Sequence, residues 1–440
     1  MNNLIKNFVN EFRDIKEPIK VVSHLDADGL TSAAILSKTL KRNNNEFSLS
    51  IVRQLDESRI KELSLEDYNY FLFVDLGSGF LGLLKKYLGD RKIFILDHHV
   101  PEDVENNFVH VNPHLLGFES DSVSGAGLAY LFSKELDEKN INLAYISVIG
   151  GAGDYINFNN GFSNQILKDA VISGEIEIKR GLKMFGSQTR YLHKLLEYST
   201  DPYIPGVSGS EEGTINFLSE LSIEFKGENG FRKLNDLSED EMKKLITGVI
   251  LKRVGSEENP EDVLGDIYLL KEGNIRDVRE YATLLNACGR LRKYSLGIGT
   301  FMGNPLLNEK AMELLKNYKK EIVKALDWFH KNKDGFVKGD GFIIINAEDN
   351  IMDSMIGTLC GMVCSSNICG REGVIVGMAY TVEGDIKVSM RTNGNVDLRE
   401  IIKNIAEGGG HSNACGAFIK REDEQDFINK MKEALTKVLV

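Results

Sequence analysis

The 440-residue sequence contains few cysteines and no long apolar run. Its five cysteines are an odd number in a large chain, which argues for reduced thiols and against a disulfide framework. No apolar run approaches the roughly 18 residues needed to cross a bilayer. The first twenty residues are polar and mixed in charge, unlike a secretory signal peptide. We therefore expect a cytoplasmic protein.

Three of the cysteines, Cys360, Cys364 and Cys369, lie close enough in sequence to suggest a zinc site. A structural zinc site needs four ligands, and no complete set is visible. Cys360 and Cys364 also lie in an apolar stretch with helical spacing, where a free cysteine packs as a small hydrophobic residue. We predict packing for these thiols.

The sequence also lacks an excess of basic residues, because its formal net charge is −12. A protein that coats nucleic acid without a local site would be basic, so the charge argues against that class. It does not exclude a nuclease, since metal ions bound at a site add positive charge that a residue count ignores.

What the sequence does have is acidic residues that directly follow short apolar runs in its first third. The segments are His24-Leu25-Asp26-Ala27-Asp28-Gly29, Asp75 within 73–77, Asp97-His98-His99, and Asp154 within 151–154. The first three follow runs 19–22, 70–74 and 93–96, which predict buried strands. In an open parallel sheet, ligands bind beyond the carboxyl ends of the strands. Unpaired buried carboxylates cost several kcal/mol each, so the pattern predicts a divalent metal site.

In this order and spacing, the four segments resemble motifs I to IV of the DHH phosphoesterases, named for their Asp-His-His triplet. That superfamily includes RecJ-type exonucleases, nanoRNases, cyclic-dinucleotide phosphodiesterases and family II pyrophosphatases. The resemblance implies two metal ions. Oxygen ligands suit Mn²⁺ and Mg²⁺, and imidazole ligands favour Mn²⁺. Two such ions about 3.5–4 Å apart can hold both the attacking and the leaving oxygen of a phosphodiester displacement.

The resemblance also implies a role for each residue of the predicted centre. Asp26 and Asp28 would each favour a different metal ion, and Asp75 would bridge the two. His98 and Asp154 would complete the shell of one ion.

Three further residues have roles that the resemblance implies beside the metal ions. Asp97 would orient a neighbouring ligand, and His99 would face the scissile phosphate, while a water bound between the ions would attack. His24 stands two residues before Asp26, whereas family II pyrophosphatases and nanoRNases place their first histidine four residues before. His24 is therefore either a direct ligand, which we expect, or a hydrogen-bond donor to one. We predict surface or packing roles for His110, His114, His193 and His330.

The chain divides into four predicted parts. Residues 1–190 alternate strand and helix patterns, which predicts an α/β fold with a doubly wound parallel sheet, the catalytic DHH domain. Residues 191–305 form a helical and less regular middle segment, of which 276–290 resembles a segment of archaeal RecJ-like nucleases. Residues 306–332 predict a long linker helix. Residues 333–440 resemble the smaller α/β domain called DHHA1.

Substrate-binding residues are expected in both domains. Ser124 lies in a Ser/Gly segment that leads into a helix, where it either meets a phosphate, which we expect, or only caps the helix. In the second domain, a predicted strand presents Ser389, Arg391 and Asn393 on one face. A glycine-rich loop that follows resembles the family's GGGH signature, and we expect its Gly409, Gly410 and His411 to contact the substrate backbone.

The leading hypothesis is a RecJ-like exonuclease of archaeal type that cleaves single-stranded DNA or RNA during DNA replication or repair. We expect 5′-to-3′ cleavage of DNA, although the residues alone do not fix the polarity. One alternative is a nanoRNase or cyclic-dinucleotide phosphodiesterase, although such enzymes usually lack the middle segment. Another is a subunit that binds the GINS replication complex and has a secondary nuclease activity. The middle segment would be the interaction surface in that case.

Overall fold

The computed structural model describes residues 1–199, 202–228, 230–257, 259–365, 370 and 372–439. The chain forms two compact units, Met1–Leu314 and Leu315–Val440. Cys369 lies outside the described residues. Among the helices that are described, none combines the length and the hydropathy needed to span a membrane.

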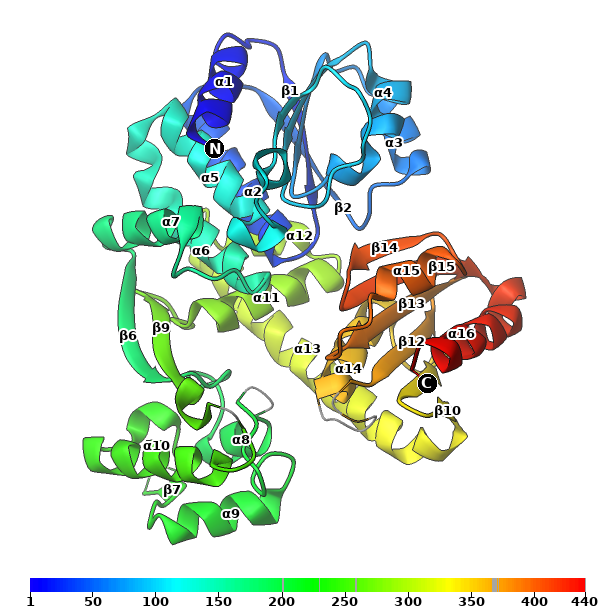
Figure 1. The fold of residues 1–440 in the computed structure, drawn as a ribbon. Helices are drawn as coiled ribbons and strands as arrows, with labels where there is room; N and C mark the ends of the chain where they lie inside the picture. Colours follow the sequence, from blue (N-terminus) through cyan, green and yellow to red (C-terminus); the bar gives the residue numbers. More distant parts are fainter. Residues whose placement is uncertain (200–201, 229, 258, 366–369, 371, 440) are drawn as a thin grey trace. The chain divides into compact units, whose positions relative to one another are not determined.

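The first unit contains a five-stranded parallel sheet with the strand order β2-β1-β3-β4-β5, of which Figure 1 labels β1 and β2. The strands are β1 (Ile19–His24), β2 (Phe47–Val52), β3 (Tyr70–Val74), β4 (Lys92–Leu96) and β5 (Val109–Val111). The central strands are rich in β-branched and aromatic residues and are buried along nearly all their length, as expected for a sheet covered on both faces. The predicted parallel α/β fold is confirmed.

Helices cover the two faces of this sheet. On one face, Phe8 and Phe12 of α1 pack edge to face against Phe94 of β4 and Phe132 of α5. On the other face, the apolar sides of α3 and α4 pack with Phe73 and other sheet residues in one buried cluster. The helices are α1 (Asn2–Phe12), α2 (Ala27–Arg42), α3 (Glu57–Ser64), α4 (Leu81–Leu88), α5 (Gly125–Leu136), α6 (Ala144–Gly153) and α7 (Gly161–Ile172).

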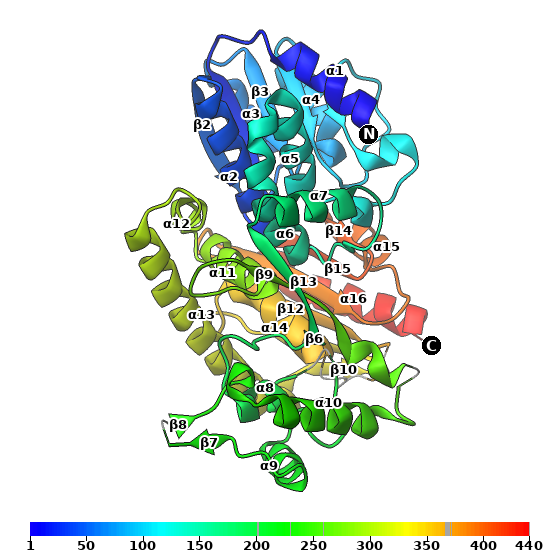
Figure 2. The ribbon, with the colours of Figure 1, turned by 90° about the vertical axis from the view of Figure 1, so that its left-hand side faces the viewer.

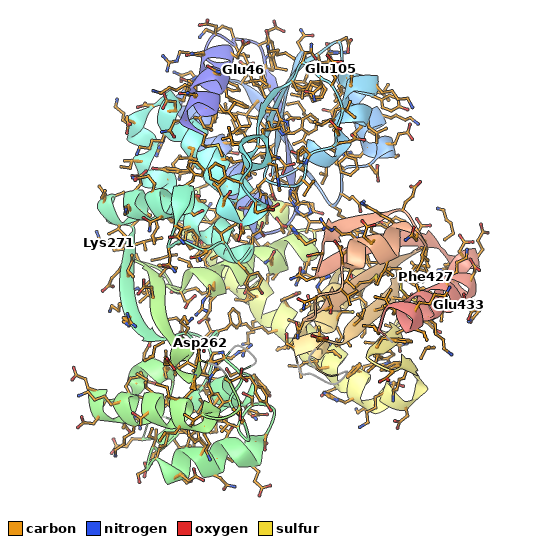
Figure 3. The ribbon with its side chains drawn as sticks, in the orientation of Figure 1. Glu46, Glu105, Asp262, Lys271, Phe427 and Glu433 are labelled. Carbon is orange, nitrogen blue, oxygen red and sulfur yellow. The ribbon has the colours of Figure 1, made fainter. Side chains whose placement is uncertain are left out.

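After α7 the chain forms a two-stranded antiparallel ribbon that carries a small helical subdomain. Strand β6 (Ile176–Leu182) pairs with β9 (Leu264–Leu270), and the two run side by side in Figure 2. The labelled Lys271 and Asp262 lie at opposite ends of β9 (Figure 3). Between the strands are α8 (Leu192–Glu197), α9 (Glu211–Glu220), the short pair β7 (Lys226–Gly227) and β8 (Gly230–Phe231), and α10 (Glu239–Arg253). These residues build their own buried apolar cluster.

Two features of this region differ from the helical middle segment expected over 191–305. Strand β9 lies within it, because its alternating residues find a partner in β6, far away in the sequence. In addition, α11 (Val278–Arg290) and α12 (Tyr294–Gly299) pack back on α2 and α6 of the sheet domain. Only residues between β6 and β9 therefore form a separate insertion, named here the insert and defined as residues 183–263.

The long helix predicted over 306–332 is confirmed as α13 (Pro305–Asn332). The second unit has a six-stranded mixed sheet in the order β10-β11-β12-β13-β15-β14. Its elements are β10 (Val337–Gly339), β11 (Phe342–Asn346), α14 (Asp353–Ser365), β12 (Val374–Tyr380), β13 (Asp385–Thr392), α15 (Leu398–Lys403), β14 (Gly408–His411), β15 (Ala414–Lys420) and α16 (Glu424–Leu439). On α16, Phe427 is buried in the core of this unit while Glu433 is exposed (Figure 3).

Candidate metal centre

The carboxyl ends of three adjacent strands bring the predicted acidic segments together. His24 ends β1, Asp75 follows β3 and Asp97 follows β4. The strands are in register here, since Ser23 pairs with Val74, and Val74 with Leu96. Helix ends supply the other three acidic positions: Asp26 caps the start of α2, Asp28 lies in its first turn, and Asp154 caps the end of α6. This is the crevice in which ligands of open parallel sheets bind.

Asp28 is fully buried and is held by the start of α5. Its carboxylate oxygens accept hydrogen bonds from the backbone N–H of Gly125 at 2.6 Å and of Ala126 at 3.1 Å. A side chain at Gly125 would collide with Asp75 and Asp28, and one at Gly150 would collide with Asp28 and Thr31. Burial, together with the nearby charges of Asp75 and Asp154, raises the pKa of Asp28 well above its usual range. A positive charge in this place would stabilise the ionised form.

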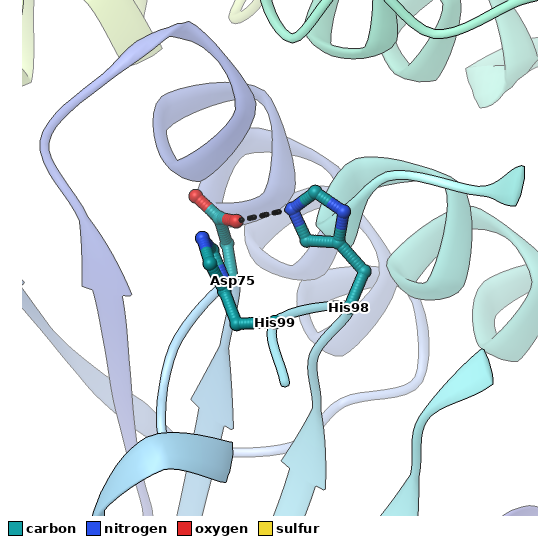
Figure 4. Close-up of side chains that lie close together, drawn as sticks. All are labelled: Asp75, His98 and His99. Atoms are coloured by element: carbon teal, nitrogen blue, oxygen red, sulfur yellow. Dashed lines mark ion pairs between the residues drawn. The ribbon is translucent and has the colours of Figure 1, made fainter. Parts of the chain in front are cut away.

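Asp75 and His98 have buried polar atoms without hydrogen-bond partners. Both carboxylate oxygens of Asp75 and Nε2 of His98 are in this state. Nε2 of His98 lies 3.5 Å from Asp75 Oδ1 (Figure 4), 3.4 Å from Asp154 Oδ2 and 3.9 Å from Asp28 Oδ2. Burial alone would lower the pKa of His98, but Asp154, Asp75 and Asp28 raise it well above the ordinary value. Such orphaned atoms are costly unless a ligand satisfies them.

His24 and Asp26 form a second group that also reaches Asp75. Nδ1 of His24 lies 2.9 Å from Asp26 Oδ2 and 3.6 Å from Asp75 Oδ2. The other oxygen of Asp26 caps α2 by accepting from Gly29 N at 2.9 Å. Burial would lower the pKa of His24, but Asp26 and Asp75 raise it well above the usual value. Burial would raise the pKa of Asp26, but His24 and the bond from Gly29 hold it well below its usual range.

Asp75 therefore belongs to all three groups of potential metal ligands that the described residues form. Two of them together contain every predicted ligand: His24, Asp26 and Asp75, and Asp28, Asp75, His98 and Asp154. The third, Asp75, His98 and His99, overlaps the second, and within each group the potential ligand atoms lie within 4.8 Å of one another. Asp75 also has a left-handed backbone, with φ at 59°, a strained conformation of the kind that gathers at functional sites. Carboxylate oxygens with one or two imidazole nitrogens are a donor set for divalent ions, so these residues fit two such ions that share Asp75.

Asp97 is fully buried and lies outside all three groups. Its Oδ1 accepts from Nδ1 of His99 at 2.8 Å and from the backbone of His98 at 2.8 Å, and its Oδ2 accepts from Ser78 N at 2.8 Å. Burial would raise the pKa of Asp97, but His99 and His98 hold it well below its usual range. The side chain of His99 is 36% exposed. Asp97 thus fixes the orientation of a partly exposed imidazole beside the cluster.

Several residues that support the centre were not predicted from the sequence. Asn112, which is fully buried, donates to the His99 carbonyl at 2.8 Å and to Ser78 Oγ at 2.9 Å. Nε2 of His110 lies 3.0 Å from the same hydroxyl, although His110 was expected to be a surface or packing residue. Nδ1 of His98 lies 2.8 Å from the carbonyl of Ser120. Asn112 and His110 come beside the motif through the pairing of β5 with β4, for which the local sequence carries no signal.

The structure shows Ser124 as the cap of α5, and its expected contact with a phosphate stays a prediction. Its hydroxyl accepts from Gly127 N at 3.1 Å, and the residue is 2% exposed. The amides of Gly125 and Ala126, which could have met a phosphate, are used by Asp28. The start of α5 binds an anion as expected for a helix N-terminus, but the anion is a side chain of the protein itself.

Comparisons with known proteins identify three domains in this order. The DHH family N-terminal domain matches residues 18–150, the DHH-CID domain matches 184–265 and the DHHA1 domain matches 339–437. The chain is a RecJ-like member of the DHH family. The DHH-CID match coincides closely with the insert, and the DHHA1 match lies in the second unit.

Three relatives illustrate the position of this DHH protein within the family. An uncharacterized protein of Methanocaldococcus jannaschii is 27% identical over 95% of this chain and 93% of its own length. The single-stranded-DNA-specific exonuclease RecJ of Thermus thermophilus is 26% identical over 41% of this chain and 28% of that protein. Its Mn²⁺ complex superposes with a TM-score of 0.62, covering 99% of this chain and 55% of that chain at 15% identity. CDC45 of Entamoeba histolytica gives a TM-score of 0.64, covering 99% and 97% at 10% identity.

Family membership and the acidic cluster together indicate a phosphoesterase that binds divalent metal. The insert and the second unit add nothing to any ligand group among the residues that are described, since all members come from residues 24–154. The DHH domain thus holds the whole predicted metal centre.

In the DHHA1 domain, the strand β13 presents Ser389 and Arg391 toward helix α14. A side chain at Gly357 of α14 would approach Ser389 Oγ at 3.1 Å and Arg391 Nη2 at 3.4 Å. Arg391 also donates to the Met390 carbonyl at 2.7 Å. Asn393 follows the strand, is exposed, and donates to the Cys364 carbonyl at 3.1 Å. Arg391 is half-buried between strand and helix, and Ser389 is buried, so of the three expected contacts Asn393 is the most accessible.

The expected glycine-rich loop is instead an edge strand, β14. It pairs antiparallel with β15, Gly409 opposite Gly416 and His411 opposite Ala414. Gly410 has φ at 133°, and a side chain there would meet the Ala414 carbonyl at 2.5 Å, so the close strand pairing requires a glycine. Gly409, Gly410 and His411 are exposed. They remain accessible to a ligand, as a strand edge and not as a flexible loop.

The packing roles predicted for Cys360, Cys364 and His193 agree with the structure. Cys360 and Cys364 are buried free thiols of α14, and burial raises the pKa of the Cys360 thiol to about 12. His193 of the insert packs among the rings of Tyr191, Phe225 and Phe231.

Proposed function

We propose that this chain is an exonuclease that hydrolyses phosphodiester bonds of single-stranded DNA with two divalent metal ions, Mn²⁺ or Mg²⁺. The observation that supports this proposal is the position of Asp75. It is common to all three ligand groups, and neither of its buried oxygens has a hydrogen-bond partner among the described residues. A carboxylate in that state suits a bridge between two ions, and a two-ion centre suits phosphodiester displacement.

In this proposal His24, Asp26 and Asp75 hold one ion, and Asp28, Asp75, His98 and Asp154 hold the other. Ions bound there would supply a water of lowered pKa and would neutralise charge that develops on the phosphate. The carboxylates are prepared for this role, because the amides of α5 hold Asp28 and the cap of α2 holds Asp26.

His99 would contact the scissile phosphate. Asp97 fixes Nδ1 of the ring at 2.8 Å, which orients the opposite nitrogen, Nε2. Burial would lower the pKa of His99, but Asp97 raises it, so that the ring carries a positive charge over a wider pH range. A charged, oriented imidazole would donate to a phosphate oxygen and stabilise negative charge in the transition state.

Substrate placement is assigned to the DHHA1 domain. Arg391 offers a planar guanidinium suited to a phosphate, and exposed His411 and Gly409 of β14 offer a further surface for the nucleic-acid backbone. Support also comes from the sequence similarity to RecJ, named as specific for single-stranded DNA. We further propose cleavage in the 5′-to-3′ direction and a place in DNA replication or repair.

The experiment that tests this function uses the purified full chain with Mn²⁺. It is offered single-stranded DNA labelled at either end, single-stranded RNA of the same sequence, and a dinucleotide. The proposal predicts mononucleotide release from the 5′ end of DNA, and no activity in Asp75→Ala. Hydrolysis of the dinucleotide without degradation of longer DNA would instead favour a nanoRNase or a cyclic-dinucleotide phosphodiesterase.

A second function, binding to a replication complex such as GINS, is supported by the surface of the insert. The insert has a core of its own, yet it leaves several large apolar side chains exposed. They are Tyr191, Tyr198, Tyr203, Phe231, Leu251 and Val254. Exposed aromatic residues near one another, such as Tyr191 and Phe231 with ring centroids 5.4 Å apart, are typical of protein interaction sites.

Size-exclusion chromatography of the chain mixed with purified GINS tests this second function. Co-elution that is lost in Tyr191→Ala/Phe231→Ala is the predicted result. Phe118→Ala, which removes an equally exposed ring outside the insert, is the matched control. If both variants co-elute like the wild type, these rings do not form the interface.

A further inference from the structure

Helix α11 lies against the loop that carries the first two carboxylates of the metal centre. A side chain at Gly289 would come within 1.9 Å of the Leu25 carbonyl oxygen, so the helix backbone directly touches residues 24–28. A side chain at Gly153 of α6 would come within 2.8 Å of Ala27 Cβ, in the first residue of α2. Leu25 and Ala27 thus pack closely against α11 and α6, at positions that only glycine can occupy.

Asn286 connects α11 to this loop by a hydrogen bond. Its side-chain Oδ1 accepts from the backbone N–H of Ala27 at 2.9 Å. Ala27 is the first residue of α2 and is buried, so its N–H has no acceptor within the helix. Asp26 Oδ1 already accepts from Gly29 N, and a second acceptor has to come from elsewhere in the chain. Asn286 supplies it from 259 residues away.

The position of this hydrogen bond matters because Ala27 lies between two predicted metal ligands. Asp26 belongs to one ligand group and Asp28 to another, while Asn286 belongs to none. Fixing the peptide between them sets the direction in which each carboxylate leaves the backbone. Residues that orient metal ligands without touching the metal affect its affinity strongly.

We infer that Asn286 is a positioning residue of the metal centre, acting through the Ala27 amide to hold Asp26 and Asp28 in the geometry that two ions require. This inference rests on the proposed two-ion function and names a residue beyond the acidic motifs. It also gives a physical role to the segment 276–290, which lies in the sequence far from every ligand.

The test compares three variants of the full chain without nucleic acid. Asn286→Ala removes the acceptor, and Asn286→Asp restores an acceptor of the same shape. Asn140→Ala is the control, since Asn140 lies in the same unit, is even more buried than the partly buried Asn286, and its Oδ1 accepts from Arg42 at the opposite end of α2. The readouts are hydrogen exchange of the peptide that contains Ala27 in metal-free protein, and Mn²⁺ affinity by calorimetry.

Asn286→Ala should speed amide hydrogen exchange at the start of α2 and weaken Mn²⁺ binding by roughly tenfold or more. Asn286→Asp should return Mn²⁺ affinity close to that of the wild type, and Asn140→Ala should leave it unchanged. The inference is overturned if Asn286→Ala binds Mn²⁺ like the wild type, if Asn286→Asp fails to restore binding, or if Asn140→Ala weakens it equally. A wild-type protein that binds Mn²⁺ and cleaves no nucleic acid would refute the proposed function alone.

Discussion

Replacing Gly125 by alanine tests whether close packing at the start of α5 shapes the metal centre. A Cβ at this position would lie 2.6 Å from Asp75 Cβ, 2.9 Å from Asp75 Cα and 2.9 Å from Asp28 Oδ2. Two of these atoms, Cβ and Cα, belong to Asp75, and Cα is a backbone atom. The contact therefore cannot be relieved by rotating a flexible side chain. Asp75 or the start of α5 has to move.

Two opposing effects set the size of the change in stability. Extra atoms in a well-packed region cost about 1–3 kcal/mol. Replacing glycine in a helix by alanine returns about 0.5–1 kcal/mol. We therefore expect a net loss of about 1–2 kcal/mol, seen as a fall of a few degrees in the melting temperature of the metal-free protein.

The larger effect should be on metal binding, because the displaced residues are both predicted ligands. At a Mn²⁺ concentration of 100 times the wild-type Kd, binding stabilises the wild type by about 2.7 kcal/mol, and a tenfold loss of affinity reduces this to about 1.4 kcal/mol. Thermal melts of Gly125→Ala with and without Mn²⁺ measure the difference. Gly82→Ala, in the first turn of α4, is the control because its Cβ would approach only the Glu102 carboxylate, at 3.4 Å. A Mn²⁺-induced shift of wild-type size in Gly125→Ala would refute the reasoning.

Three further predictions concern other parts of the chain. Asp75→Ala should abolish DNA cleavage. The circular dichroism spectrum should stay that of the wild type, because the side chain lies at the end of β3 and not within the sheet. Near-normal activity at saturating Mn²⁺ would exclude a bridging role. Arg391→Ala should raise KM for oligonucleotides by about one to two decades, the equivalent of roughly 1.5–3 kcal/mol for one charge-assisted hydrogen bond. The loss in kcat should be smaller, and Mn²⁺ affinity should not change. An unchanged KM would show that Arg391 does not bind substrate. Joining Lys183 to Val263 through an Asn-Gly turn removes the insert except for these two end residues and should preserve dinucleotide hydrolysis, since Leu182 and Leu264 are already paired and the turn closes a two-stranded ribbon. Loss of that hydrolysis in a folded protein would show that the insert contributes to the chemistry.

The parallel sheet and the acidic cluster could be predicted because both depend on local pattern. Apolar runs that end in Asp75 and Asp97 predict buried strands, and strands of a parallel sheet end at one edge. No long-range information was needed to expect that the residues after these strands converge.

The supporting residues could not be predicted, because their roles come from contacts between distant segments. Asn286 is an ordinary polar residue in an amphipathic helix until α11 packs against the loop at Ala27. Likewise, Asn112 gains its role only when β5 pairs with β4. The surroundings of Ser124 have the same origin, since the amide of Gly125 beside it binds Asp28, which lies 97 residues earlier in the chain.

For two further segments the sequence predicts the wrong secondary structure, and the cause is physical. A run of three glycines predicts a loop by propensity, yet β14 is a strand because close pairing with β15 leaves no room for a side chain at Gly410. The local pattern predicts β9 as part of a helical region, because its partner β6 is separated from it by the whole insert. In both cases tertiary pairing outweighs local preference.

The central claim is that Asp75 bridges two metal ions, and a Mn²⁺ titration followed by electron paramagnetic resonance tests it most directly. Two ions roughly 3.5–4 Å apart that share a carboxylate couple magnetically, so the signal of isolated Mn²⁺ should be lost as the protein fills with two ions per chain. Asp75→Asn should bind fewer ions, and any that bind should give the uncoupled signal. A single ion per wild-type chain, or two uncoupled ions that persist in Asp75→Asn, would contradict the account.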